Sequence, residues 1–117
     1  MLHLSASVRY YFFSGITDMR RGHDSLCGIV TSQMKLDDLS GAIFMFINRR
    51  RNQVKLLLWE GDGLSLYHKR LEKGTYELPG TSDNNASSNI TYQQLQFILQ
   101  GVSLAKIQYR KRYKKVA

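Results

Sequence analysis

The sequence is poor in the features that mark secreted and membrane proteins. It has one cysteine, Cys27, so no intramolecular disulfide can form. Its longest apolar run, Ala42–Ile47, has six residues, whereas a transmembrane helix needs roughly twenty. The N-terminus lacks the basic residues followed by an apolar stretch that are typical of a signal peptide. These absences predict a protein of the reducing cytoplasm that has no membrane association.

Acidic residues are absent from the C-terminal part of the chain. Residues 84–117 carry six basic and no acidic side chains, whereas residues 1–83 carry eleven basic and nine acidic ones. The net charge of +8 is therefore concentrated at the C-terminal end, where a polyanion would be attracted most strongly. The alternative is a tail that only aids solubility, although solubility alone does not explain this asymmetry.

Length and patterning predict one α+β domain with a mostly antiparallel sheet, spanning residues 1–105, and a basic tail at residues 106–117. Apolar and alternating runs between turn residues are typical of strands, and Thr91 and Gln94 have capping-box spacing. The expected order is strand, helix, four strands, helix. Strands are expected at residues 8–13, 43–48, 54–59, 64–71 and 75–78, helices from Thr17 or Asp18 to about Lys35 and from Thr91 to about Val102, and a flexible loop at residues 79–89.

The C-terminal run combines cations with tyrosines. Cations neutralise phosphates, and aromatic rings stack on unpaired bases, so this composition favours nucleic-acid contact over a merely solvated tail. The candidate binding residues are Lys106, Tyr109, Arg110, Lys111, Arg112, Tyr113, Lys114 and Lys115.

A second cationic cluster, Arg49, Arg50 and Arg51, is expected at the tip of a hairpin, with Asn52 suited to the turn. Three guanidiniums on a rigid base could hold phosphates or carboxylates bidentately. An exposed turn kept polar is the equally simple alternative. Arg20–Arg21 lies near the expected start of the first helix, where the helix dipole disfavours positive charge, so a partner is possible there too.

Metal binding and catalysis find little support in the residues. His23 and Cys27 have i,i+4 spacing, but a structural zinc site usually needs four ligands, so a packed cysteine beside a surface histidine is the favoured interpretation. Glu60 and Asp62 are the one carboxylate pair that would suit a metal-dependent nuclease. No nucleophile motif or phosphate-binding glycine loop is present. We expect no metal, no cofactor, no small-molecule substrate and no enzymatic activity.

Four segments resemble one known family and together span nearly the whole chain. They are T-D-M-R-R-G-H-D-S-L-C-G-I-V (Thr17–Val30), F-I-N-R-R-R-N-Q-V-K-L-L-L-W-E-G-D-G (Phe46–Gly63), Y-H-K-R-L-E-K-G-T-Y-E-L-P (Tyr67–Pro79) and R-K-R-Y (Arg110–Tyr113). The chain resembles TnpB, the second-open-reading-frame (Orf2-like) accessory protein of IS66-type bacterial insertion sequences. It is unlike the longer RNA-guided nuclease of the same name, which carries zinc-binding cysteines.

The resemblance implies a part in transposition beside a separate, larger transposase that carries the catalytic carboxylates. The leading hypothesis is a non-catalytic accessory protein that binds the DNA of the element ends through Arg49–Arg51 and the tail. The alternative is a protein-interaction adaptor for the transposase with little direct role at DNA. A third hypothesis is a small metal-dependent nuclease that uses Glu60 and Asp62.

Overall fold

The computed structural model describes residues 4–78 and 86–100 of the chain. Five strands and two helices lie within these ranges. They are β1 (Tyr10–Ile16), α1 (His23–Ser32), β2 (Ile43–Ile47), β3 (Gln53–Trp59), β4 (Leu64–Arg70), β5 (Ser87–Ile90) and α2 (Tyr92–Leu99).

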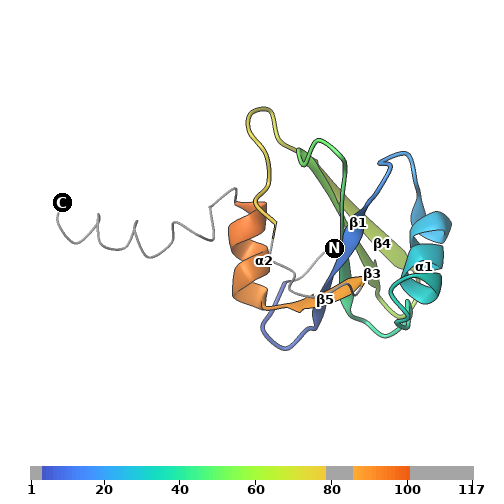
Figure 1. Cartoon of the computed structure of the whole chain (residues 1–117). Helices are drawn as coiled ribbons and strands as arrows, with labels where there is room; N and C mark the ends of the chain where they lie inside the picture. Colours follow the sequence, from blue (N-terminus) through green and yellow to red (C-terminus); the bar gives the residue numbers. More distant parts are fainter. Residues whose placement is uncertain (1–3, 79–85, 101–117) are drawn as a thin grey trace.

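The strands form one sheet in the order β4-β3-β2-β1-β5. β1 pairs parallel with β2, and the other three pairs are antiparallel. The parallel pair requires a crossover connection, which α1 supplies. The predicted α+β class, the mostly antiparallel sheet and the element order are confirmed (Figure 1).

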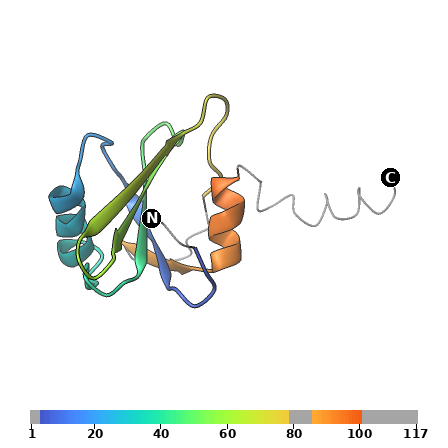
Figure 2. The same cartoon turned by 180° about the vertical axis from the view of Figure 1, so that it is seen from behind.

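The two helices cover opposite faces of the sheet, as the reverse view also shows (Figure 2). Successive side chains of a strand point to opposite faces. Phe44 and Phe46 therefore pack with α1, while Ile43, Met45 and Ile47 pack with α2. All five are buried, which explains why this strand is a continuous apolar run. Burying each of these side chains stabilises the fold by about 1.5–3 kcal/mol.

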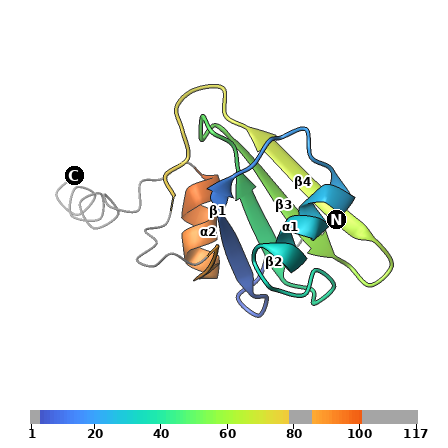
Figure 3. The same ribbon diagram turned by 45° about the vertical axis from the view of Figure 1, so that its right-hand side comes forward.

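The helix α2 begins where the capping-box spacing predicts. Thr91 is its N-cap: its side chain accepts a hydrogen bond from the Gln94 amide, and the Gln94 side chain accepts one from the Thr91 amide. Leu95 and Ile98 are buried against the sheet. Figure 3 shows α2 beside β1 and well apart from α1.

The helix α1 is shorter than predicted. It begins at His23, with Gly22 as N-cap, and it ends at Ser32 instead of near Lys35. The prediction that Thr17 or Asp18 caps it is wrong, because the Thr17 backbone is bonded to β2 and the Asp18 side chain to Arg20. The Thr17 amide donates to the Ile47 carbonyl, and the Asp18 carboxylate binds Arg20.

The last predicted strand and the predicted loop are also corrected. Residues 75–78 are not a strand. Tyr76, 1% exposed, joins the core, and its amide donates to the Arg51 carbonyl. The last strand of the chain is instead β5, and its residues Ser87–Asn89 fall within the predicted loop. These polar residues are extended because they pair with β1 at the edge of the sheet. Residues 79–85 of that loop lie outside the described residues.

In the part of the chain that the structure describes, neither helix is long and apolar enough to cross a membrane.

Candidate nucleic-acid interface

Three strands have their carboxyl ends along the same edge of the sheet, the edge that runs across the strands. β1 is parallel to β2, and β4 runs in the same direction as β2 because both are antiparallel to β3. The segments that follow β1, β2 and β4 therefore meet at this edge, which is uppermost in Figure 1. In open α/β sheets the carboxyl ends of the parallel strands are the usual place for a ligand.

A hollow of about 840 Å³ lies at this edge. We call it the arginine hollow, because five arginines from three segments line it together with one carboxylate. Its lining residues are Ile16, Thr17, Asp18, Met19, Arg20, Arg21, Asn48, Arg49, Arg50, Asn52, Gln53 and Arg70.

One wall is the turn between β2 and β3, and Asn48 holds it together. The Asn48 side-chain oxygen accepts hydrogen bonds from the amides of Asn52 (3.1 Å) and Gln53 (2.9 Å). Its side-chain nitrogen donates to the side-chain oxygen of Asn52 at 2.8 Å. Arg51, not Asn52, takes the left-handed conformation, with φ of 58°. That conformation costs about 1–2 kcal/mol for a residue with a Cβ atom. Arg49 and Arg50 are exposed on this braced turn.

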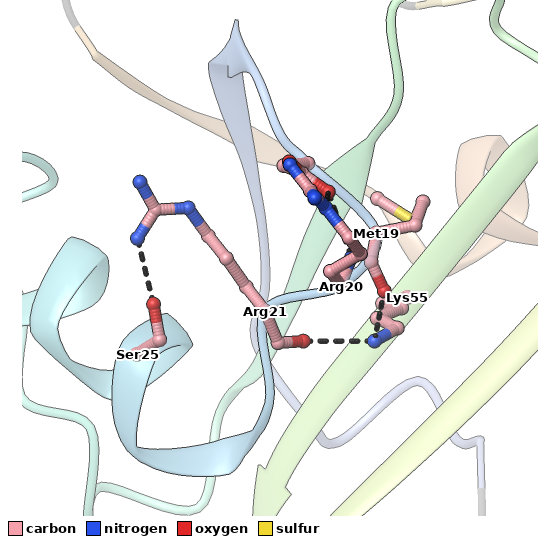
Figure 4. A network of polar contacts seen from close by, with 6 residues as sticks. Met19, Arg20, Arg21, Ser25 and Lys55 are labelled. Carbon is pink, nitrogen blue, oxygen red and sulfur yellow. Dashed lines mark hydrogen bonds and ion pairs between the residues drawn. The ribbon is translucent and has the colours of Figure 1, made fainter.

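The other wall is the segment that joins β1 to α1. Asp18 accepts a bond from the Arg20 amide at 2.9 Å and binds the Arg20 guanidinium at 2.6 Å. The side-chain hydrogen bond from Arg20, followed by the amide bond, lowers the pKa of Asp18 from 3.8 to about 2. The Arg21 guanidinium donates to Ser25 Oγ on α1 at 2.6 Å (Figure 4).

Two buried polar side chains lie at the base of this second wall. Lys55, 7% exposed, donates from Nζ to the carbonyls of Met19 and Arg21, both at 2.8 Å. Thr17 is 1% exposed, and its Oγ1 has no hydrogen-bond partner in the part of the chain described. Beside Lys55 on β4, His68 forms a 2.8 Å hydrogen bond with the side-chain oxygen of Gln53. Burial, and then the charges of Lys55 and Arg70, lower the pKa of His68 below 6.5.

The positive charge of the arginine hollow is only partly neutralised. Arg20 pairs with Asp18, and Arg70 lies 3.7 Å from the exposed Glu72. Across residues 4–78 and 86–100, no carboxylate forms an ion pair with Arg21, Arg49 or Arg50. Clustered guanidiniums attract anions and bind phosphates or carboxylates with paired N–H donors.

The sequence matches a known protein family over most of its length. A family model described as "IS66 Orf2 like protein" matches residues 8–109. The chain belongs to the IS66 Orf2-like family. The match includes every residue of the arginine hollow, and it confirms the family that the sequence segments indicated.

Two curated relatives of this IS66 Orf2-like chain come from Sinorhizobium fredii. The uncharacterized protein y4hO is 34% identical over 102 residues, which cover 87% of each chain. The uncharacterized protein y4jC is 27% identical over 119 residues, which span both chains completely. No solved structure matches the chain. Membership of the IS66 Orf2-like family supports an accessory role in insertion-sequence transposition.

The structure divides the cationic clusters that the sequence predicted. Arg49 and Arg50 line the arginine hollow, whereas Arg51 lines a separate hollow beside Tyr76. Arg20–Arg21 lines the arginine hollow too, although at the end of a loop and not in the first turn of a helix. The predicted tail residues lie outside the described residues: Lys106, Tyr109, Arg110, Lys111, Arg112, Tyr113, Lys114 and Lys115.

Three residues of the arginine hollow and its base were not predicted as site residues from the sequence: Thr17, Lys55 and Arg70. Lys55 carried one usable signal, because a lysine interrupts the apolar run of β3. Such a lysine needs buried hydrogen-bond acceptors. Thr17 was interpreted as a helix cap, and Arg70 joins the other arginines only through strand register.

The residues considered for metal binding or catalysis, His23, Cys27, Glu60 and Asp62, lie outside the arginine hollow. His23 is exposed at the start of α1, and Cys27 is partly buried. Burial, and then a hydrogen bond and the negative charge of Asp38, raise the pKa of Cys27 to about 11. Glu60 accepts a hydrogen bond from Ser65 at the β3–β4 turn. Among the residues described, no three His, Cys, Asp or Glu side chains gather into a group that could hold a metal ion.

Proposed function

We propose that this protein is a non-catalytic accessory protein of insertion-sequence transposition that binds DNA through the arginine hollow. One observation carries the proposal: five arginines from three separate segments line one hollow that holds a single carboxylate. The matched family supplies the transposition context. The separate transposase that the resemblance implies would carry out the chemistry.

The proposed contact is with the phosphate backbone. Guanidiniums bind phosphate oxygens through two parallel N–H bonds, and such contacts position a protein without reading the bases. Arg49 and Arg50 would approach the backbone from one wall, and Arg20 and Arg21 from the other. The basic tail, residues 106–117, would add cations to the same polyanion on the grounds of its composition.

Fluorescence anisotropy tests the proposal. A labelled duplex of the element's terminal repeat and a scrambled duplex are titrated with protein over a salt series. The logarithm of the affinity should fall with the logarithm of salt concentration by about 0.9 per neutralised phosphate. Replacing Arg49 and Arg50 by glutamine should reduce the slope, whereas replacing Arg9 and Lys35, two cations outside the hollow, should leave it nearly unchanged.

One observation favours an adaptor for the transposase as the second candidate function. Ile16 lines the arginine hollow and is 59% exposed, so a protein docked there would bury a large apolar side chain that phosphate contacts do not use. Absence of DNA binding at moderate salt, together with co-purification of the transposase after nuclease treatment in high salt, would favour the adaptor.

A further inference from the structure

Lys55 is a buried lysine that the proposed DNA contact does not use directly. Lysine is almost never buried unless its ammonium group is paired, because removing the charge from water costs several kcal/mol. Lys55 nevertheless points inward from the middle of β3 at 7% exposure. Within the described ranges its hydrogen-bond partners are two backbone carbonyls, and no carboxylate forms an ion pair with it.

The two carbonyls belong to Met19 and Arg21, on either side of Arg20. Figure 4 shows the Lys55 ammonium between these oxygens, with the Arg21 side chain extending the other way to Ser25. Asp18 fixes the same segment from its other end by accepting the Arg20 amide. The backbone of the second wall is therefore tied to the sheet by a side chain more than thirty positions later in the sequence.

The first wall is braced independently by Asn48, within its own turn. The register of β2 against β3 sets Lys55 opposite Phe46, and one strand pair, Ile47 with Val54, separates them from Asn48 on the same hairpin. One hairpin thus carries Arg49 and Arg50 at its tip and the anchor for Arg20 and Arg21 on its stem. The relative placement of the two walls is set by that hairpin.

We infer that Lys55 is the positioning residue of the arginine hollow: it holds the Met19–Arg21 segment so that both walls grip one phosphodiester backbone. This inference rests on the proposed DNA binding at the hollow. Lys55 does not touch the nucleic acid in this arrangement. Its effect on affinity passes through Arg20 and Arg21.

The test is a double-mutant cycle on the full chain. Lys55→Met keeps the length of the side chain and removes the ammonium group, and it is measured in the parent protein and in an Arg20→Gln/Arg21→Gln protein. We expect the affinity for the labelled duplex to fall about tenfold in the parent and less than about twofold in the arginine-deficient protein. The salt slope should fall in the parent only, because the lost contacts are phosphate contacts.

Lys69 supplies the matched control. It lies on β4, next to β3, and its Nζ likewise donates to a backbone carbonyl, that of Leu99 at 3.0 Å. It pairs with Val54, which packs on the α2 side, so its side chain faces away from Lys55. Lys69→Met removes the same charge and the same type of bond, and we expect it to change duplex affinity by less than about twofold.

The outcomes separate the two proposals. If the parent protein binds no duplex, the proposed function fails before Lys55 is considered. If the parent binds and Lys55→Met costs the same factor with and without Arg20 and Arg21, Lys55 acts only as a distant charge and the positioning role is overturned. An unchanged affinity in the parent overturns it as well.

The wild-type protein gives a reading that does not depend on a folded variant. Nuclear magnetic resonance should show a slowly exchanging Lys55 ammonium group hydrogen-bonded to the Met19 and Arg21 carbonyls, with signals that move when duplex is added. A rapidly exchanging ammonium, or signals that stay in place while the duplex binds, would contradict the inference.

Discussion

The two ends of the sheet carry opposite charges. At the carboxyl ends of β1, β2 and β4, five arginines line a hollow with one carboxylate. At the opposite end, Asp37 and Asp38 precede β2, while Glu60 and Asp62 lie at the turn from β3 to β4. Among residues 4–78 and 86–100, only Arg9 and Lys35 bring positive charge to that end, from the residues before β1 and after α1.

The comparison shows how a balanced sequence becomes a polarised surface. Residues 1–83 hold nearly equal numbers of basic and acidic side chains, interleaved along the chain. The directions of the strands place most of these arginines at one end and four of the acids at the other, while Asp18 and Glu72 stay with the arginines. A polyanion is attracted to the arginine end and repelled from the acidic end, so the fold itself orients the approach.

Charge removal at the two ends should have the largest and most unequal effects. Replacing Arg20, Arg21, Arg49 and Arg50 by glutamine should weaken duplex binding by about a hundredfold at moderate salt, because about four phosphate contacts are lost. Replacing Asp37, Asp38, Glu60 and Asp62 by their amides should strengthen it less than about fivefold. Equal changes from the two sets, measured by anisotropy, would remove the distinction between the ends.

Removing the brace of the first wall should destabilise the fold. Asn48→Ala leaves the amides of Asn52 and Gln53 without their shared acceptor. We expect the free energy of unfolding to fall by about 2 kcal/mol, measured by urea denaturation. Asn48→Asp keeps the acceptor oxygen and serves as the control. A stability of Asn48→Ala equal to that of the control would mean that the turn is held by its backbone alone.

The unpartnered hydroxyl of Thr17 predicts an unusual stabilising substitution. Thr17→Val keeps the shape of the side chain and removes a buried oxygen that makes no hydrogen bond within the described residues. We expect the free energy of unfolding to rise by about 1 kcal/mol. Thr17→Ser retains the hydroxyl and should show no gain. A loss of stability in the valine variant would indicate that the hydroxyl has a partner in solution.

The carboxylate of the arginine hollow should oppose DNA binding slightly and give stability a pH dependence. Asp18→Asn retains an acceptor for the Arg20 amide, so duplex affinity should rise about two- to threefold as the negative charge is lost. Because the pKa of Asp18 is lowered to about 2, its contribution to stability is full above pH 3.8 and is lost as the pH falls toward 2. The melting temperature of the variant should show less acid sensitivity in that range; identical pH profiles would contradict this assignment.

Local signals in the sequence were enough for several elements. Thr91 and Gln94 define the start of α2, because a capping box needs only residues three apart. The apolar run of β2 predicts a strand buried on both faces, as observed. These predictions succeed because each rests on interactions within one segment or on burial alone.

Other features depend on partners distant in the sequence. Ser87–Asn89 are polar, and they form a strand because their backbone pairs with that of β1. The helix α1 begins only at His23, because the preceding residues are hydrogen-bonded to Ile47 and Lys55 of the sheet. The arginine hollow itself joins Arg20, Arg49 and Arg70 through strand register, which no single-segment pattern encodes.

A map of the duplex-binding surface tests the central claim most directly. Amide signals of isotope-labelled protein are followed by nuclear magnetic resonance while terminal-repeat duplex is added. We predict the largest shifts at residues 17–21, 48–53 and 70, with little change at residues 36–42 and 60–64. Shifts centred on the acidic end, or spread equally over both ends, would contradict the assignment of DNA binding to the arginine hollow.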